Sequence, residues 1–215
     1  MLGGADEIFS KFRYEGMWWV CFFACRNGGR SRWLPGMNDR ARLPRLDPGF
    51  YRGRAAGHWT MAMEDRATGW LDECFHLRLR EILVHVGVRY HLVFPVYCLM
   101  PDHAHFLVMG CRPAADQRLG IRMLRKSFTR FLPEGIALQR QAHDHVLREA
   151  ECQRGAFENL AGYILQNPLR AGLVEEETAY AFCGSIVPGY PSLDPHREGF
   201  WESFWMAFEA VSVDA

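Results

Sequence analysis

The stretch Met100-Pro-Asp-His-Ala-His-Phe-Leu-Val108 directly follows the apolar run Leu92 to Leu99. β-branched and aromatic residues on either side of Pro101-Asp102 predict a strand, a tight turn and a second strand. Because alternate side chains of a strand point to the same face, His103 and His105 are expected to project side by side. Two imidazoles placed in this way can bind one metal ion, although a His-x-His pair is also common on a polar sheet surface.

A second stretch, about sixty residues further along, offers partners for these histidines. It reads Tyr163-Ile-Leu-Gln-Asn-Pro-Leu-Arg-Ala-Gly-Leu-Val174, and it places Tyr163 and Asn167 four residues apart. Residues with this spacing share one face of a helix. The stretch therefore predicts a phenol nucleophile and an amide oxygen ligand that are able to meet the two histidines.

Together the two stretches resemble the REP-associated tyrosine transposases, which are relatives of the small single-strand transposases of the HUH endonuclease superfamily. The family pattern is roughly Met-Pro-Asn-His-x-His followed by hydrophobic residues, and later Tyr-Ile-x-x-Asn-Pro-x-Arg-Ala-Gly-Leu-Val. Asp102 stands where the family usually has Asn, and we expect this departure to leave the metal ligands untouched. The resemblance covers about residues 70–205, and three further segments occur in the family's order: Lys126–Thr129, Asp144–Arg148 and Gly184–Pro195.

The resemblance implies a metal-dependent single-stranded DNA endonuclease and strand transferase that acts on hairpin-forming repeats. Tyr163 is then the catalytic residue that becomes linked to a 5′-phosphate, and this covalent link keeps the bond energy needed to rejoin a second strand. His103, His105 and Asn167 are the expected ligands of one Mg²⁺ or Mn²⁺ ion, which polarises the phosphate. The alternative is a domesticated nucleic-acid-binding protein without catalytic activity. Either a monomer or a homodimer is compatible with the sequence.

The distribution of charge is more informative than its sum. The formal net charge of the 215 residues is zero, but the segment from Arg26 to Arg54 contains eight arginines and only two aspartates. Such a segment is either a solvated loop or a phosphate-binding surface. We expect DNA contacts from this segment and from the outward face of a later helix, through Arg40, Arg42, Arg45, Arg122, Arg125 and Lys126.

The elements expected from hydrophobic periodicity follow the order strand, helix, strand, strand, helix, strand and helix. They are placed at Met17–Cys25, Leu71–Val88, Arg89–Leu99, His103–Met109, Leu119–Phe131, Ala137–Arg148 and Glu151–Gln166. This order predicts an α+β fold of the ferredoxin-like split βαβ type, with a central antiparallel sheet and an extra C-terminal helix that carries the tyrosine. The first two helices should cover one face of the sheet, and the tyrosine helix should lie near the face that displays the histidines.

We expect residues 1–215 to form a single domain. Residues 1–68 would contribute a divergent strand and an arginine-rich insertion, in which residues 26–68 show little periodicity. The catalytic core and tail would follow over residues 69–205. The seven cysteines lack the spacing of a disulfide framework, and neither a secretory signal nor a membrane span is recognisable, so a cytoplasmic bacterial protein is expected.

Several competing interpretations of single residues are weaker. Cys98 and Cys111 flank the two histidines, but their spacing fits no zinc-finger template. His143 and His145 form a second His-x-His pair without an apolar middle residue, which indicates strand-surface polarity or support of the site. Tyr180 and Tyr190 are weaker candidate nucleophiles because their surroundings show less regular periodicity.

Overall fold

The computed structural model describes residues 45–213, whose strands form one five-stranded antiparallel sheet in the order β4-β1-β3-β2-β5. The first four strands have the arrangement of a split βαβ fold, in which β3 lies between β1 and β2. This confirms the predicted α+β class and ferredoxin-like order, and it adds β5 at the edge beside β2. The strands are β1 (Ala56–Ala62), β2 (Leu92–Met100), β3 (His103–Gly110), β4 (His143–Val146) and β5 (Cys183–Ile186).

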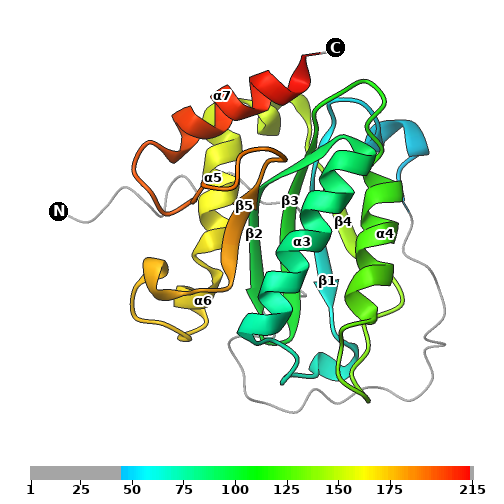
Figure 1. Cartoon of the computed structure of the whole chain (residues 1–215), viewed down its shortest axis with the longest axis vertical. Coiled ribbons are helices and arrows are strands. Elements are labelled where there is room, and N and C mark those ends of the chain that lie inside the picture. The colour runs from blue at the N-terminus through cyan, green and yellow to red at the C-terminus, as the bar shows by residue number, and fades with distance from the viewer. Residues whose placement is uncertain (1–44, 214–215) are drawn as a thin grey trace. The chain divides into compact units, whose positions relative to one another are not determined.

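Two helices lie side by side on one face of the sheet, α3 (Glu73–Tyr90) and α4 (Gln117–Thr129), as Figure 1 shows. Each begins at an aspartate whose carboxylate accepts a hydrogen bond from a free backbone N–H of the first turn. Their apolar residues form one core cluster with Ala104, Phe106 and Val108 of β3. Because these β3 side chains alternate with the histidines, α3 and α4 cover the face turned away from His103 and His105.

The opposite face is covered by α5 (Arg154–Leu165), whose apolar side chains pack in a second core cluster. That cluster contains Leu107 of β3 and Val96 of β2, together with Phe157 and Ile164 of α5. Leu107 shares its face with His103 and His105, so α5 lies over the face that displays the histidines, as the sequence predicted. The remaining helices are α6 (Asn167–Arg170), α7 (Phe200–Ser212) and the 3-10 helices η1 (Pro48–Tyr51), η2 (Glu64–Arg66), η3 (Glu149–Cys152) and η4 (Glu177–Ala179).

No helix between residues 45 and 213 is both long enough and apolar enough to cross a lipid bilayer.

One strand of the sheet lies where the sequence analysis expected little regular structure, and that expectation was wrong. The first strand of the described sheet is β1, which lies within residues 26–68, where we expected little regular structure. Trp59 and Met61 are fully buried under α3 and α4, whereas His58 and Thr60 point to the other face. The strand is difficult to recognise because its inward side chains alternate with polar ones and its flanks are rich in glycine and arginine. The strand expected at Met17–Cys25 lies outside the described residues.

Gly110, at the end of β3, leaves no room for a side chain. A Cβ atom at this position would lie 1.8 Å from the carbonyl oxygen of Gly53, which belongs to the backbone and cannot turn away. We expect Gly110→Ala to destabilise the protein by about 3 kcal/mol. Thermal unfolding measures the effect, with Gly155→Ala on α5 as the control, since its Cβ meets nothing within 4 Å. Equal melting temperatures for both variants would contradict this packing.

Candidate functional site

The central strand β3 brings the two predicted histidine ligands together. The Nε2 atoms of His103 and His105 lie 3.0 Å apart, and their rings meet edge to face. Hydrogen-bonded pairing with β1 on one side and β2 on the other fixes the backbone of both residues. His105 is only 6% exposed. The pair therefore sits on a rigid platform in the middle of the sheet.

Asp102 contacts the site directly, so the expectation that it leaves the ligands untouched was wrong. His103 donates its Nδ1 hydrogen to Asp102 Oδ1 at 2.6 Å, and Arg66 forms an ion pair with Asp102 Oδ2, also at 2.6 Å. Burial alone would raise the pKa of Asp102, but the hydrogen bond from His103 and the charges of His103 and Arg66 outweigh it and lower the pKa. The lowered pKa keeps the carboxylate ionised near neutral pH.

His105 is supported from the neighbouring strand by neutral groups. Its Nδ1 lies 3.0 Å from His58 Nε2 and 3.2 Å from Thr60 Oγ1. Burial, together with the charges of His145 and His103, lowers the pKa of His58 to about 4. Burial also holds the pKa of His105 well below its ordinary value, with contributions from His58 and His103. Both rings are therefore uncharged near neutral pH, which is the state that binds metal ions.

The histidine pair fits a divalent metal ion. When His105 donates its Nδ1 hydrogen to His58 or Thr60, the Nε2 atoms of His103 and His105 present two lone pairs to one another. Two ligands that are each about 2.1 Å from one metal ion are separated by about 3 Å, which matches the observed spacing. A cation between the two nitrogens would relieve their repulsion.

Among the residues that the structure describes, no group of three or more His, Cys, Asp or Glu side chains could hold a metal ion. Within the described residues, further ligands of such an ion would come from other groups, such as amide oxygens, or from water or substrate. The structural zinc site considered from Cys98 and Cys111 is not supported, since the Cys111 thiol donates to the carbonyl of His91 instead.

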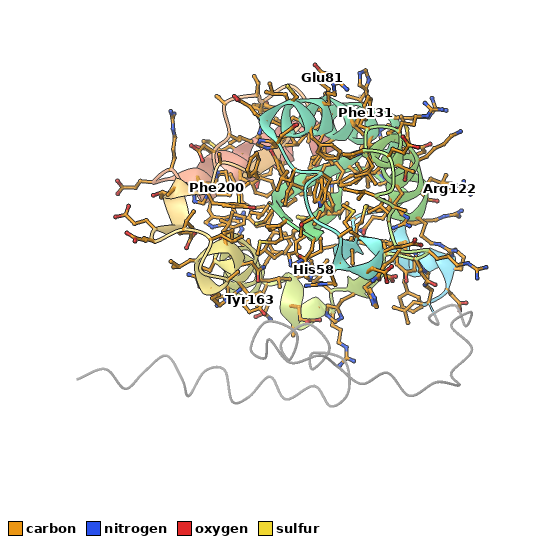
Figure 2. The ribbon with its side chains drawn as sticks, turned by 90° about the horizontal axis from the view of Figure 1, so that it is seen from below. His58, Glu81, Arg122, Phe131, Tyr163 and Phe200 are labelled. Atoms are coloured by element: carbon orange, nitrogen blue, oxygen red, sulfur yellow. The ribbon has the colours of Figure 1, made fainter. Side chains whose placement is uncertain are left out.

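Arg170 joins the two predicted residues of the second stretch. Its guanidinium carbon lies 3.8 Å from the centre of the Tyr163 ring, and its Nη2 donates to Asn167 Oδ1 at 3.1 Å. The charge of Arg170 is also one of those that lower the pKa of His105. Figure 2 shows Tyr163 and His58 on one side of the sheet, and Glu81 of α3 on the other. No hydrogen bond between Asn167 and either histidine is formed.

The sequence analysis expected Tyr163 and Asn167 to share one face of a helix, but the two residues lie on separate helices. The helix α5 ends at Leu165, and Asn167 begins α6. Pro168 lacks the N–H that would bond to the carbonyl of Ile164, four residues before it. The side chain of Asn167 takes over this role, because its Nδ2 donates to Ile164 O at 3.1 Å. This bond fixes the amide so that Oδ1 is left to accept from other partners.

The hydroxyl groups of three other tyrosines are engaged in the fold. Tyr180 donates to the carbonyl of Leu99 at 2.6 Å, and burial raises its pKa. Tyr51 donates to Asp144 at 2.5 Å, and burial raises its pKa to about 12. The Tyr97 hydroxyl accepts from Arg80 at 2.8 Å, and burial again raises the pKa to about 12. These engaged hydroxyls make Tyr180, Tyr51 and Tyr97 poor candidate nucleophiles, whereas Tyr163 lies half-buried on the histidine face of the sheet.

A groove of about 400 Å³ lies between α4 and the segment around η1 and is lined mainly by arginines. Arg125 donates one guanidinium nitrogen to the carbonyl of Gln139, whereas its buried Nη1 has no partner within residues 45–213. Burial and the charge of Arg45 lower the pKa of Arg125. The groove gathers five arginines and one carboxylate, a composition suited to an anion: Arg45, Arg52, Arg118, Arg122, Arg125 and Asp116.

Three of the arginines that we expected to contact DNA line this groove, namely Arg45, Arg122 and Arg125. Arg45 is partly engaged within the protein, as it pairs with Asp144 at 3.4 Å and lies over the Trp59 ring. Arg122 is exposed and points outward in Figure 2. Lys126 is exposed on α4 but does not line the groove. Arg40 and Arg42 lie outside the described residues.

Sequence reasoning missed four residues that contact the site: His58, Thr60, Arg66 and Arg170. His58 and Thr60 could have been found only by recognising β1 and its register with β3. His145 faces the same side of the sheet but bonds to Glu151 at 2.9 Å, which agrees with the interpretation of the second His-x-His pair as supporting polarity.

Comparisons with known proteins confirm the resemblance to the REP-associated tyrosine transposases. A Haemophilus influenzae protein named for this family is 25% identical over 156 residues, which cover 65% of this chain and 79% of the relative. A solved structure of a REP-associated tyrosine transposase bound to a REP hairpin shares the fold. Its TM-score is 0.56 at 16% identity, over 81% of this chain and 92% of that one. No family model matches the chain.

Proposed function

We propose that this chain is a metal-dependent HUH tyrosine transposase that nicks and rejoins single-stranded or hairpin DNA through a covalent 5′-phosphotyrosine. The observation that carries the proposal is the pair of imidazoles on β3, whose Nε2 atoms lie 3.0 Å apart, beneath the helix that bears Tyr163. The similarity to a protein named for this family, and to a family structure with a bound REP hairpin, supports the choice of substrate.

The chemical step exchanges one phosphate ester for another. The Tyr163 oxygen forms a bond to phosphorus as its proton leaves, and the bond from phosphorus to the 3′ oxygen breaks. That oxygen takes up a proton, so the products are a tyrosine-linked 5′ phosphate and a free 3′ hydroxyl. Reversal with another 3′ hydroxyl rejoins DNA without an external energy source.

The residues around Tyr163 hold and neutralise the reacting phosphate. His103 Nε2, His105 Nε2 and the Asn167 amide oxygen are the proposed ligands of one Mg²⁺ or Mn²⁺ ion, which would offset negative charge on the phosphate oxygens. Arg170 adds a fixed cation beside Tyr163 and keeps the phenol ring in place by stacking. The partners on Nδ1 of each histidine keep Nε2 directed towards the site.

A nicking assay tests the proposal. A labelled single-stranded hairpin oligonucleotide should be cut in Mn²⁺, and cutting should stop when EDTA removes the ion. A fully paired duplex of the same sequence should remain intact, because the flanking strand cannot enter the site. Binding without any cutting, under conditions in which Mn²⁺ binding is measurable, would favour the catalytically silent alternative.

We further propose that the arginine groove holds DNA phosphates. If the groove holds DNA phosphates, the double variant Arg118→Gln/Arg122→Gln removes two phosphate contacts. For single-stranded DNA the slope of log affinity against log salt concentration should become shallower by about 0.7 per contact, or about 1.4 in total. Affinity should fall similarly for cognate and scrambled hairpins, since phosphate contacts carry little sequence information. Fluorescence anisotropy at several salt concentrations measures both quantities.

The matched control is Arg78→Gln/Arg89→Gln, which removes two exposed arginines of α3 outside the groove. This variant loses the same net charge and should keep the wild-type slope. Equal slopes for the two double variants would show that the groove does not contact DNA.

A further inference from the structure

The turn after β1 holds two consecutive residues in the left-handed region of backbone conformation. Asp65 has φ 50° and Arg66 has φ 57°. Aspartate tolerates this conformation fairly well, but a long side chain such as arginine rarely adopts it unless tertiary contacts maintain it. The contact that Arg66 makes is the 2.6 Å ion pair with Asp102, in the turn between β2 and β3.

Asp102 is fixed at three points. Its backbone carbonyl accepts a hydrogen bond from Met63 N at 2.9 Å. One carboxylate oxygen pairs with Arg66, and the other accepts from His103 Nδ1 at 2.6 Å. The side chain of Asp102 is only 20% exposed and that of His103 is 12% exposed, so water competes little for these bonds. The backbone carbonyl and both carboxylate oxygens of Asp102 are therefore all engaged.

We propose that Arg66 and Asp102 act as a pair of positioning residues for the His103 ring. This inference rests on the proposed function, because it assigns the pair a role towards the metal ion that His103 and His105 would hold. A carboxylate that accepts the Nδ1 hydrogen selects the tautomer with a free Nε2 lone pair and makes that nitrogen a stronger ligand. Arg66 holds the other carboxylate oxygen and so fixes the rotamer of the carboxylate.

The two histidines thus have supports of different chemical character. His103 has an ionic support, whereas His105 has the neutral partners His58 and Thr60. An asparagine at position 102 could still accept the Nδ1 hydrogen, but it could not form an ion pair with Arg66. Arg66 and Asp102 therefore form one unit, and a change in either should affect the same ring.

Calorimetric titration of the full-length protein with Mn²⁺ provides the first test. Asp102→Ala should weaken Mn²⁺ binding by about tenfold or more. Asp102→Asn should have a smaller effect, because the amide keeps the hydrogen bond and loses only the charge. Arg66→Ala should also weaken binding, and Arg66→Lys should restore part of the loss by keeping a cation near the carboxylate. The matched control is Arg197→Ala, which removes the more exposed ion pair with Asp194.

Nitrogen-15 NMR of the histidine rings in the metal-free protein provides the second test. In the wild type, His103 should show a protonated Nδ1 and an unprotonated Nε2. Asp102→Ala and Arg66→Ala should mix the two tautomers of His103 and leave His105 less affected. A role limited to folding stability would not produce this selective change, and thermal unfolding of each variant shows whether the fold is retained.

The outcomes separate the two proposals. Wild-type affinity for Mn²⁺ in both Asp102→Ala and Arg66→Ala would overturn the positioning role. A wild-type protein that fails to bind Mn²⁺ would overturn the proposed metal site, and the NMR result alone would then decide whether Arg66 and Asp102 position the ring. An unchanged His103 tautomer in both variants would overturn the inference in either case.

Discussion

Tyr163→Phe should abolish DNA cleavage while leaving hairpin binding nearly intact. The substitution removes only the hydroxyl oxygen, and the ring that remains can still lie against Arg170, 3.8 Å away. Loss of a catalytic nucleophile lowers turnover by many orders of magnitude, so we expect a decrease on the order of 10⁴-fold or more. Gel analysis of the cleavage products measures turnover, and fluorescence anisotropy measures binding.

Tyr190→Phe is the matched control, because Tyr190 is 39% exposed in a loop and no role is proposed for it. This variant should cleave at the wild-type rate. Cleavage by Tyr163→Phe at a rate close to that of Tyr190→Phe would show that another group attacks the phosphate.

His105→Ala should reduce metal binding and cleavage together. The substitution removes one of the two proposed imidazole ligands, so the expected loss of Mn²⁺ affinity is about 100-fold or more, which exceeds the loss typical of residues that only support a ligand. The strand should persist, because β3 remains paired through its backbone with β1 and β2. Calorimetry measures the affinity, and circular dichroism shows whether the fold is retained.

His143→Ala is the control for this variant, since His143 is exposed on the edge strand β4, on the same face of the sheet as His105. It should bind Mn²⁺ as the wild type does. His105 is buried, so its replacement could also affect folding. His103→Ala therefore provides a second variant, in which the other proposed ligand is lost. Unchanged calorimetric titrations in both His103→Ala and His105→Ala would place the metal site elsewhere.

Local sequence patterns predicted the histidine pair, because its arrangement depends on residues that are close together in the sequence. The alternation around Ala104 places His103 and His105 on one face, and the apolar runs on both sides require a buried hairpin. The order of the elements then predicted the central position of β3 and the helix that covers the histidines. These features follow from periodicity within single strands and helices.

The remaining features depend on contacts between distant segments. His58 supports His105 only because β1 pairs with β3 in one particular register, and that register is set by the packing of Trp59 and Met61. Arg66 reaches Asp102 through a left-handed backbone conformation that arginine itself rarely adopts. Pro168 also removes one backbone hydrogen bond at the end of α5, and the sequence alone does not show that the Asn167 side chain replaces it.

The most direct test of the proposed function is to identify the residue that becomes linked to DNA. The wild-type protein is incubated with a single-stranded hairpin oligonucleotide and Mn²⁺, digested with protease and nuclease, and analysed by tandem mass spectrometry. We predict a nucleotide adduct on the peptide that contains Tyr163, attached through the phenol oxygen. Cleavage products without any protein adduct, or an adduct located on a different residue, would contradict the proposed mechanism.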